Sequence, residues 1–496
     1  MKPKNMQNSN ENKVKGNIEL SKIKILVWGD SPTVATGFGT VIRGIFTELA
    51  KIGKYDIDII GINDRGGWKD PQQYPFKIYP AKIGIEEAGD LYGRPRLIAA
   101  PLGRDTDLKP PWDIIFTLND PFILEQPLPI FKEGTLTILR QEQEALKKQK
   151  QVNPKFWFKI ISYWPIDSPL KGNWIEKAIA VPDYSVAYTQ YGKKQIEKAD
   201  LILDKPTNIS PKIKVIYHGI NLKNFYPLPK DKVQQFRKEF FEDKLKPDTF
   251  LIIVVARNQL RKDLPRTMQI FKEFQKRRPD SFLYFHCQES DVWGSLKEYA
   301  RNWNLRLGED WAYPVGFSAN IGFPIEALNY IYNSADCILS TSLGEGFGFY
   351  NLEGFATKKI VIAPNNTTHS ELFDYDANED ISDMDKLYTK VRGIPLKCGN
   401  SLSEWATFGG QDFERIRPLT NVEDAVKKLI WVYDNQDKVG QIVERAYSWV
   451  QNYTWENIAK QWDELFQQVY KELENERNKT KFNSIKEIRS KSPKSK

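Results

Sequence analysis

Short apolar runs alternate with longer amphipathic segments along most of the chain. Runs rich in Ile, Val and aromatic residues predict strands at residues 23–29, 56–62, 113–118, 158–164, 184–188 and 213–217. Apolar positions at helical spacing predict helices between these strands, for example at residues 40–52. Strands that alternate with helices favour parallel sheets built from βαβ units.

A second alternating series begins near residue 250. It predicts strands at residues 250–256, 282–286, 336–339 and 359–363, with helices such as 266–276 and 324–333 between them. The end of the chain has a helical pattern at residues 422–433, 439–450 and 455–473. Residues 64–110 are rich in Gly, Pro and charge and indicate a long insertion.

The two series predict two α/β domains joined by one linker. We expect a first Rossmann-like domain at residues 23–222, a linker at 223–247, a second domain at 248–452 and a C-terminal helix at 453–475. The predicted fold class is α/β, with two doubly wound sheets that face a central cleft. Because ligands bind outside the carboxyl ends of the strands in such sheets, that cleft is the expected ligand site.

Composition narrows the class of protein. The chain has 496 residues, of which 41% are hydrophobic, and this is typical of a globular protein with more than one domain. Its mean hydropathy is −0.53, and no apolar run approaches the ~18 residues that predict a transmembrane segment. The N-terminal residues lack the apolar stretch of a signal peptide, and the three Cys are far apart, which argues against a disulfide framework. We therefore expect a cytoplasmic protein.

The net charge of +8 is concentrated at the two ends of the chain. Residues 1–24 hold six Lys against two Glu, and residues 477–496 hold eight Lys or Arg against one Glu, which leaves residues 25–476 with a net −3. Residues 1–22 and 476–496 are expected to be disordered basic tails, and they are the candidates for a weak contact with a polyanion.

The most informative segment is the Gly-rich run at residues 344–354, which follows a predicted strand and leads into a helix. It contains Gly346, Phe347, Gly348 and Phe349 between two carboxylates, Glu345 and Glu353. Glycines at such a turn let backbone N–H groups approach a ligand, and a helix N-terminus favours phosphate. The two carboxylates can accept hydrogen bonds from the hydroxyls of a polyol; equally, they can serve only to complement the helix dipole.

Two further segments lie where predicted strands end. Arg257 and Lys262 follow the strand at 250–256, at the edge where a diphosphate needs neutralising, although a solvated basic loop gives the same pattern. Gly37 and Gly39 follow the first strand and form half of a dinucleotide fingerprint, or else a flexible turn. Ile42 stands where that fingerprint has its third Gly, which argues against a nicotinamide enzyme.

Taken together, these segments resemble the group 1, or family 4, retaining glycosyltransferases of the GT-B fold. Glu345 and Glu353 match the E-x7-E pattern of that family, and Arg257 and Lys262 match its Arg/Lys pair. The resemblance extends over roughly residues 23–465, with the motifs in the family's order and spacing.

The resemblance implies an enzyme that moves a sugar from a UDP- or GDP-sugar donor to a hydroxyl acceptor, with retention and without a metal or other cofactor. Arg257 and Lys262 would neutralise the diphosphate and stabilise the leaving nucleotide. Glu345 and the backbone of residues 346–349 would contact the sugar, and Glu353 the ribose. Gly37 and Gly39 of the acceptor-side first domain would close over the diphosphate, and the C-terminal helix would cross back to that domain.

The sequence departs from the family on the acceptor side. Many members carry a His in the first domain near the reacting carbon, whereas the corresponding strands here end at Asp120 and Asp167. Either carboxylate can replace that His in orienting the acceptor or the sugar, or can cap a helix or turn. The acceptor therefore stays open: a glycan, a lipid, a protein or modified DNA. Three scattered His and no paired Cys argue against a metal site.

Other functions share some of these features. A nucleotide-sugar epimerase of the same fold would use the same donor without an acceptor. A non-catalytic nucleic-acid binder would act through the basic tails, and its affinity would fall steeply with salt.

Overall fold

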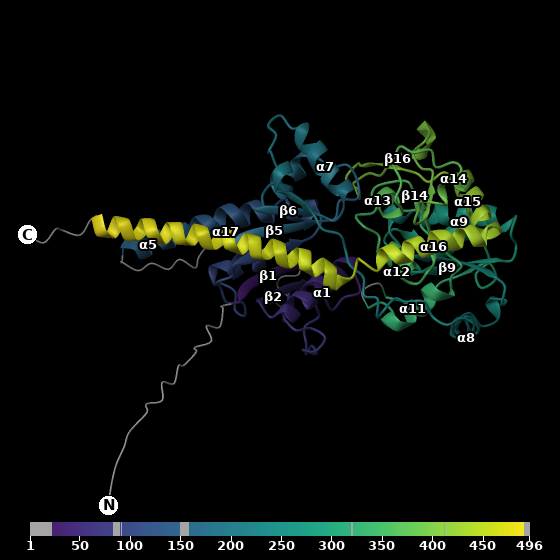
Figure 1. Ribbon diagram of the computed structural model, residues 1–496, viewed down its shortest axis with the longest axis horizontal. Coiled ribbons are helices and arrows are strands. Elements are labelled where there is room, and N and C mark those ends of the chain that lie inside the picture. Colours follow the sequence, from purple (N-terminus) through teal and green to yellow (C-terminus); the bar gives the residue numbers. More distant parts are fainter. Residues whose placement is uncertain are drawn as a thin grey trace, which may run out of the picture.

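The protein is described here from a computed structural model that places residues 22–82, 90, 92–148, 158–318, 321–410 and 412–490. Two α/β domains lie side by side, and the long helix α17 (Trp455–Ser490) runs from the second domain along the first (Figure 1). Of the expected N-terminal tail, residues 1–21 lie outside the described residues, as do residues 491–496 at the other end.

The first domain is built on a seven-stranded parallel sheet with the strand order β3-β2-β1-β4-β5-β6-β7. Its strands are β1 (Ile23–Asp30), β2 (Tyr55–Ile62), β3 (Lys77–Pro80), β4 (Ile114–Leu118), β5 (Lys159–Trp164), β6 (Tyr184–Ala187) and β7 (Ile213–Val215). In the centre of the sheet Val27 pairs with Ile59 on one side and Phe116 on the other. Helices cover both faces, which explains why these strands are apolar throughout rather than alternating.

The second domain has a six-stranded parallel sheet with the order β12-β9-β8-β13-β14-β15. Its strands are β8 (Phe250–Val255), β9 (Ser281–His286), β12 (Trp311–Ala312), β13 (Cys337–Leu339), β14 (Ile360–Pro364) and β15 (Ile394–Leu396). The predicted α/β class with two facing Rossmann-like sheets is confirmed. The sequence did not predict β3, β12 and β15, which are short edge strands with too few residues for a periodic pattern.

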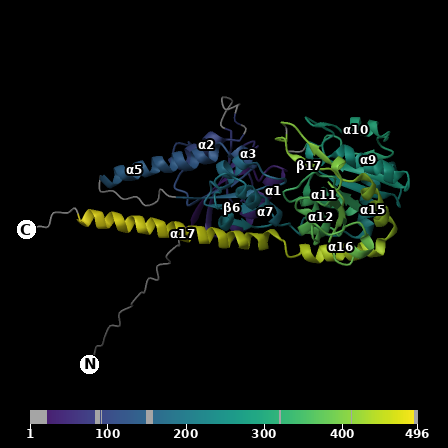
Figure 2. The ribbon, with the colours of Figure 1, turned by 90° about the horizontal axis from the view of Figure 1, so that it is seen from above.

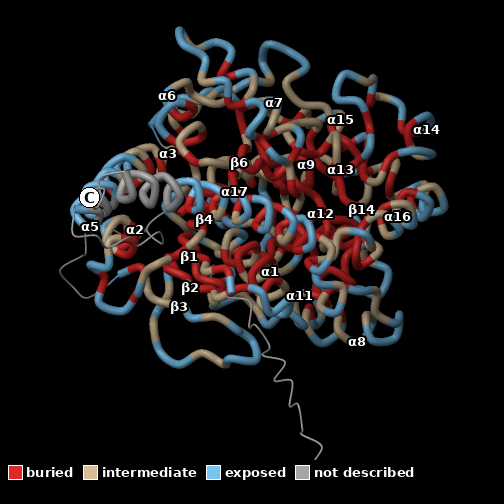
Figure 3. Tube along the Cα trace, turned by 60° about the vertical axis from the view of Figure 1, so that its left-hand side comes forward, coloured by how far each residue is buried: buried red, intermediate tan, exposed pale blue. Residues whose placement is uncertain are grey.

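Helices pack in layers around these sheets, and Figure 3 shows the buried positions concentrated in the centre of each domain. One face of the first sheet is covered by α1 (Gly37–Ile52) and α17, and the apolar cluster on this face continues into the second domain. The other face is covered by a separate cluster that includes residues of α2 (Arg94–Ala99) and α7 (Gln190–Leu201). No helix among the described residues is long and apolar enough to cross a membrane.

The structure differs from the expected domain boundaries in two places. Within the expected linker 223–247, residues of α8 (Lys230–Phe241) form a helix whose Phe241 is buried against Tyr284 of the second domain, at 5.3 Å between ring centroids. Residues 476–490, which the sequence predicts as part of a disordered tail, continue helix α17. At the start of this continuation Arg477 is buried and pairs with Asp113 at 2.7 Å.

The return of α17 to the first domain depends on aromatic packing. Trp462 packs on Phe116 and Tyr163, with ring centroids 5.4 and 4.9 Å apart. At the start of the helix, a Cβ on Gly44 of α1 would lie 2.3 Å from the indole of Trp455. The absence of a side chain at Gly44 therefore lets α1 and α17 approach closely. Figure 2 shows α17 running along one side of the first domain.

Gly44→Ala should lower the free energy of unfolding by about 1–3 kcal/mol, because the new methyl group overlaps Trp455. Gly440→Ala is the matched control, since Gly440 is also helical and has no atom within 4 Å of the position of its Cβ. There the gain in helix propensity should raise stability by about 0.5–1 kcal/mol. Urea denaturation of the three proteins measures both effects, and equal stability of the two variants would contradict the packing argument.

Candidate active site between the two domains

The two sheets meet across a cleft of about 1310 Å³ that receives the carboxyl ends of the strands of both domains. From the first domain it is lined by residues that follow β1, β4 and β5, and from the second by residues that follow β8, β9 and β13. The sequence-predicted residues that line it are Gly37, Asp120, Asp167, Arg257, Lys262, Glu345, Gly346, Phe347, Gly348, Phe349 and Glu353. Gly39 lies in the same turn but does not line the cleft.

In the first domain the chain after β1 turns sharply into α1. Thr36 caps the helix by accepting a hydrogen bond from Gly39 N–H at 3.0 Å, and its own hydroxyl donates to Asp30 at 2.5 Å. A Cβ on Gly39 would lie 2.7 Å from the carbonyl oxygens of Ser31 and Val34, so this turn needs Gly. Gly37 begins the helix and faces the second domain, where the Phe349 ring lies 4.0 Å from the position of its Cβ. The N-terminus of α1 thus points at the Gly-rich loop.

The Gly-rich loop of the second domain lies between β13 and α12 (Phe349–Ala356). Gly348 caps α12 with a φ of 81°, a left-handed conformation that suits Gly. A Cβ on Gly346 would lie 3.3 Å from Pro165 of the first domain. The glycines therefore serve both the turn and the close approach of the two domains.

Glu345 is the most strongly paired carboxylate of the cleft. One oxygen accepts from Lys262 Nζ and the other from Arg261 Nη1 at 3.0 Å, and its side chain is 5% exposed. Burial alone would raise the pKa of Glu345, but Lys262 and Arg261 hold it well below its ordinary value. Burial and the neighbouring Arg261 lower the pKa of Lys262 to about 8, against the opposing effect of Glu345. The site therefore holds a permanently ionised carboxylate.

The two cations predicted from the sequence occupy different environments. Lys262 reaches Glu345, whereas Arg257 is exposed on the cleft wall on the side of Asp30, whose raised pKa it partly offsets. Arg261, which the sequence analysis passed over, is the residue that shares Glu345 with Lys262. The two are adjacent in a single 3-10 turn (Leu260–Lys262), and this short turn leaves no periodic signal that would rank one cation above another.

Glu353 lies on α12, eight residues after Glu345, which stands in the loop before that helix. Its carboxyl accepts a hydrogen bond from the Tyr332 hydroxyl at 2.5 Å, and burial raises its pKa to about 7. Near neutral pH Glu353 therefore carries a proton part of the time and can donate as well as accept a hydrogen bond. The two members of the E-x7-E pair have opposite electrostatics, because only Glu345 has cations beside it.

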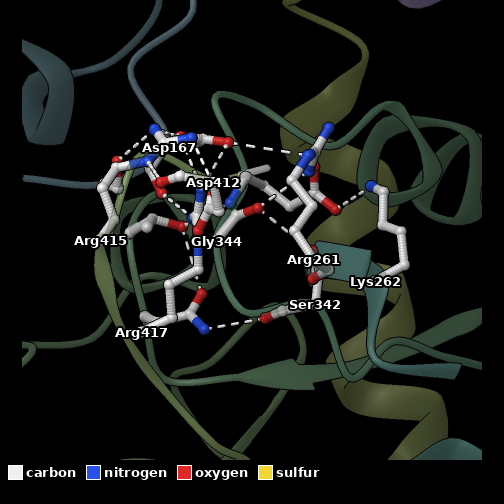
Figure 4. A network of polar contacts seen from close by, with 12 residues as sticks. Asp167, Arg261, Lys262, Ser342, Gly344, Asp412, Arg415 and Arg417 are labelled. Carbon is white, nitrogen blue, oxygen red and sulfur yellow. Dashed lines mark hydrogen bonds and ion pairs between the residues drawn. The ribbon is translucent and has the colours of Figure 1, made fainter. Parts of the chain in front are cut away.

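Asp167, at the end of β5, is surrounded by arginines of the second domain (Figure 4). Arg415 approaches one of its oxygens at 3.1 Å, Arg417 at 3.4 Å, and Arg261 approaches the other oxygen at 3.7 Å. Burial would raise the pKa of Asp167, but these cations lower it. Asp167 therefore joins the two domains and is not a helix cap.

Asp120, at the end of β4, has the opposite environment. It precedes the short helix α3 (Pro121–Leu124), yet its side chain does not cap that helix, and it has no hydrogen-bond or ion-pair partner among the described residues. Burial, together with the nearby charge of Asp167, raises the pKa of Asp120 to about 7, against the opposing charges of Arg261 and Arg415. The Tyr188 hydroxyl in the same cleft is likewise buried without a partner in the described part of the chain.

The three His are buried and neutral. Burial lowers the pKa of His218 to about 3, and its ring lies between Tyr188 of the first domain and Phe349 of the second. His369 bonds the Tyr350 hydroxyl at 2.7 Å beneath the Gly-rich loop. His286 borders the cleft at the end of β9, with Phe317 and Phe323 about 5 Å away, centroid to centroid. These two Phe were not singled out from the sequence, where they stand in a loop without periodicity.

Among the residues that the structure places, no group of three or more His, Cys, Asp or Glu side chains is arranged to hold a metal ion. The absence of a metal requirement stays a prediction.

Comparison with solved structures shows that the same arrangement of domains occurs elsewhere. A glycosyltransferase from Rickettsia africae has a TM-score of 0.57 with this chain at 16% identity, covering 91% of this chain and 99% of its own. Sucrose-phosphate synthase from Thermosynechococcus elongatus has a TM-score of 0.60 at 14% identity, with 90% and 99% covered. The chain has the GT-B fold.

HepE from Anabaena, solved in complex with UDP, shares this GT-B fold with a TM-score of 0.56 at 13% identity, covering 90% of this chain and all of its own. The sequence matches no protein-family model and no curated protein. The likeness is one of fold, and the function of this GT-B protein has to be argued from its cleft.

Asp120→Asn should stabilise the protein above neutral pH. An Asp in an unfolded chain has a pKa of about 3.9, whereas Asp120 in the folded protein has a pKa of about 7, so the folded state holds a proton that the unfolded state releases. The loss of folding stability caused by Asp120 is therefore absent below pH ~4, grows between pH ~4 and pH ~7, and is constant above pH ~7. We expect Asp120→Asn to gain up to about 4 kcal/mol at pH 8 and nothing at pH 4, since the two pKa values differ by about three and a difference of one corresponds to about 1.4 kcal/mol.

Urea denaturation across this pH range measures the gain. Asp167→Asn is the matched comparison and should lose stability above pH ~4, because the pKa of Asp167 is lowered in the folded state. A pH-independent difference between wild type and Asp120→Asn would contradict the assignment of a protonated, unpartnered carboxyl.

Proposed function

We propose that the protein is a glycosyltransferase that moves a sugar from a nucleotide-sugar donor to an acceptor hydroxyl, with retention and without a metal. The observation that carries this proposal is the constellation around Glu345. A carboxylate kept ionised by Lys262 and Arg261 stands beside a Gly-rich helix N-terminus and faces a second helix N-terminus across the cleft. Two helix N-termini and two cations can bind the negative charge of a diphosphate, and an ionised carboxylate can accept hydrogen bonds from sugar hydroxyls.

The second domain would hold the donor. The diphosphate would lie between the N-terminus of α12 and the cations Lys262 and Arg257, with Gly37 closing from the first domain and Gly39 shaping the turn behind it. Glu345 and the backbone of residues 346–349 would contact the sugar. Glu353 would bind the ribose, and its raised pKa lets it donate or accept there. His286, Phe317 and Phe323 offer aromatic surfaces for the base at the end of β9.

The first domain would present the acceptor. Of the two carboxylates expected there, Asp120 is the better candidate for contact with the acceptor hydroxyl, since it has no partner among the described residues and Asp167 is occupied by arginines. A carboxyl with a pKa of about 7 can take the proton of an attacking hydroxyl at neutral pH. Lys262 and Arg257 would stabilise the charge that develops on the leaving nucleotide.

The solved structures of the same fold agree with this proposal. Two of those compared are described as a glycosyltransferase and a sucrose-phosphate synthase, and the HepE structure contains UDP. For this chain a UDP- or GDP-sugar is the first donor to test.

Donor binding and turnover test the proposal in sequence. A panel of UDP-, GDP- and ADP-sugars should contain one that raises the melting temperature, because a ligand that binds only the folded state stabilises it. With that donor, Glu345→Gln and Lys262→Ala should lower turnover by on the order of 10²-fold or more, since each removes charge stabilisation in the cleft. Lys276→Ala is the matched control, because Lys276 pairs with Glu273 one turn earlier, does not line the cleft and should keep the wild-type rate.

The assay also separates the proposal from its competitors. Isomerisation of the donor sugar without any acceptor would identify an epimerase, and wild-type turnover in both Glu345→Gln and Lys262→Ala would remove the glycosyltransferase proposal. A chain that stops at residue 478 keeps the buried pair of Arg477 with Asp113 and should keep its turnover. If this truncation abolished the binding of both donor and polyanion, the basic end of the chain would be the functional part.

A further inference from the structure

A small hairpin of the second domain reaches across the cleft mouth to the first domain. It consists of β16 (Trp405–Thr407) and β17 (Ile416–Pro418), and the sequence analysis did not predict it. In its connecting segment Phe413 packs between Phe122 and Trp174, with ring centroids 4.6 and 5.5 Å away. The segment therefore contacts the loops that follow β4 and β5, where Asp120 and Asp167 stand.

The charges under this hairpin form one continuous network (Figure 4). Arg417 is 1% exposed; it donates to Asp412 at 2.6 Å and to the Asp167 carbonyl oxygen at 3.0 Å. Arg415 bridges the same two residues, at 2.5 Å to Asp412 and 3.1 Å to Asp167. Buried arginines of this kind are stable only when each is paired, so loss of Asp167 leaves cations that have lost part of their compensation.

The network extends through Arg261 to Glu345, the carboxylate at the centre of the proposed site. Arg261 lies 3.7 Å from Asp167 and 3.0 Å from Glu345, and it also donates to the carbonyl oxygen of Gly344 at 3.0 Å. A Cβ on Gly344 would lie 2.1 Å from the Asp167 carbonyl oxygen, so the two domains are in backbone contact at this point. Glu345 is thus linked through Arg261 to a carboxylate of the other domain, while Lys262 holds it from its own domain.

We propose that Asp167 is a positioning residue for Arg261 and that the β16–β17 hairpin is a latch that holds the two domains closed. The inference rests on the proposed function for its kinetic consequence, but the latch itself is a property of the free protein. All three arginines, Arg415, Arg417 and Arg261, contact the same carboxylate of Asp167. Opening of the domains therefore breaks the three contacts together, and closure forms them together. Catalysis is thereby coupled to closure, because Arg261, which shares Glu345 with Lys262, meets Asp167 only in the closed state.

The latch also sets the charge around Asp120. The charged groups near Asp120 are Asp167, Asp30, Arg261 and Arg415, with the neutral hydroxyls of Tyr92 and Tyr188 close by. Asp167 raises the pKa of Asp120 and Arg415 lowers it. The two sides of the same ion pair therefore have opposite effects on the group proposed to take the acceptor proton.

Small-angle scattering of the full chain without any ligand tests the latch directly. Asp167→Asn and Arg415→Met should both increase the radius of gyration, and 1 M salt should do the same to the wild type. Lys276→Ala, which removes an exposed ion pair with Glu273 inside the second domain, should leave it unchanged. If Asp167→Asn does not fold, Arg415→Met carries the test, since Arg415 retains 15% exposure and its partner Asp412 keeps Arg417. An unchanged radius of gyration in the variants would overturn the latch.

Kinetics with the active donor test the positioning role. Asp167→Asn should lower kcat by on the order of 10²-fold with a smaller change in KM for the donor, as expected of a misplaced reacting group. Asp167→Glu should recover part of the rate.

The acidic limb of the pH–rate profile should move to lower pH in Asp167→Asn and to higher pH in Arg415→Met. Shifts in the same direction would overturn the electrostatic part of the inference. If the wild type turns over no donor at all, the proposed function fails while the scattering result still decides the latch.

Discussion

The arrangement of this protein depends on one buried set of ion pairs between its domains. Asp167 of the first domain meets Arg261, Arg415 and Arg417 of the second, and Arg261 passes the contact on to Glu345. Charges that leave water must be paired with good geometry, so this cluster is stable in only one relative position of the domains. The hydrophobic cores hold each domain together, but the charges select how the two domains face each other.

Other contacts at the interface are consistent with that single position. Glu371 of the second domain accepts hydrogen bonds from the N–H groups of Gln190 and Tyr191, both at 3.0 Å, and so caps α7 of the first domain. The neutral ring of His218 fills the junction between aromatic residues of both domains. The cap by the Glu371 carboxylate is a charge-assisted contact, so separation of the domains would break electrostatic contacts at Glu371 as well as at Asp167.

Much of the fold is predictable from the sequence because it depends on local patterns. The central strands are continuous apolar runs, and the Gly-rich loop with Glu345 and Glu353 stands next to a strand in the sequence as it does in space. The edge strand β3 and the β16–β17 hairpin have too few residues for such a pattern. The helical extension of α17 beyond residue 475 was missed because its amino-acid composition is that of a solvated tail, and the stabilising contact of Arg477 with Asp113 is made with a distant segment.

The least predictable part of the site is the difference between Asp120 and Asp167. Both follow apolar strands of the same sheet and both precede a turn, so nothing local separates them. The difference comes from the second domain, which brings three arginines to one carboxylate and leaves the other without a partner among the described residues. The same rule distinguishes Glu345 from Glu353, where only the first has Lys262 and Arg261 beside it. In both pairs the roles follow from which carboxylate the folded chain supplies with a cation. One member of each pair becomes a fixed charge, and the other keeps a proton that it can exchange near neutral pH.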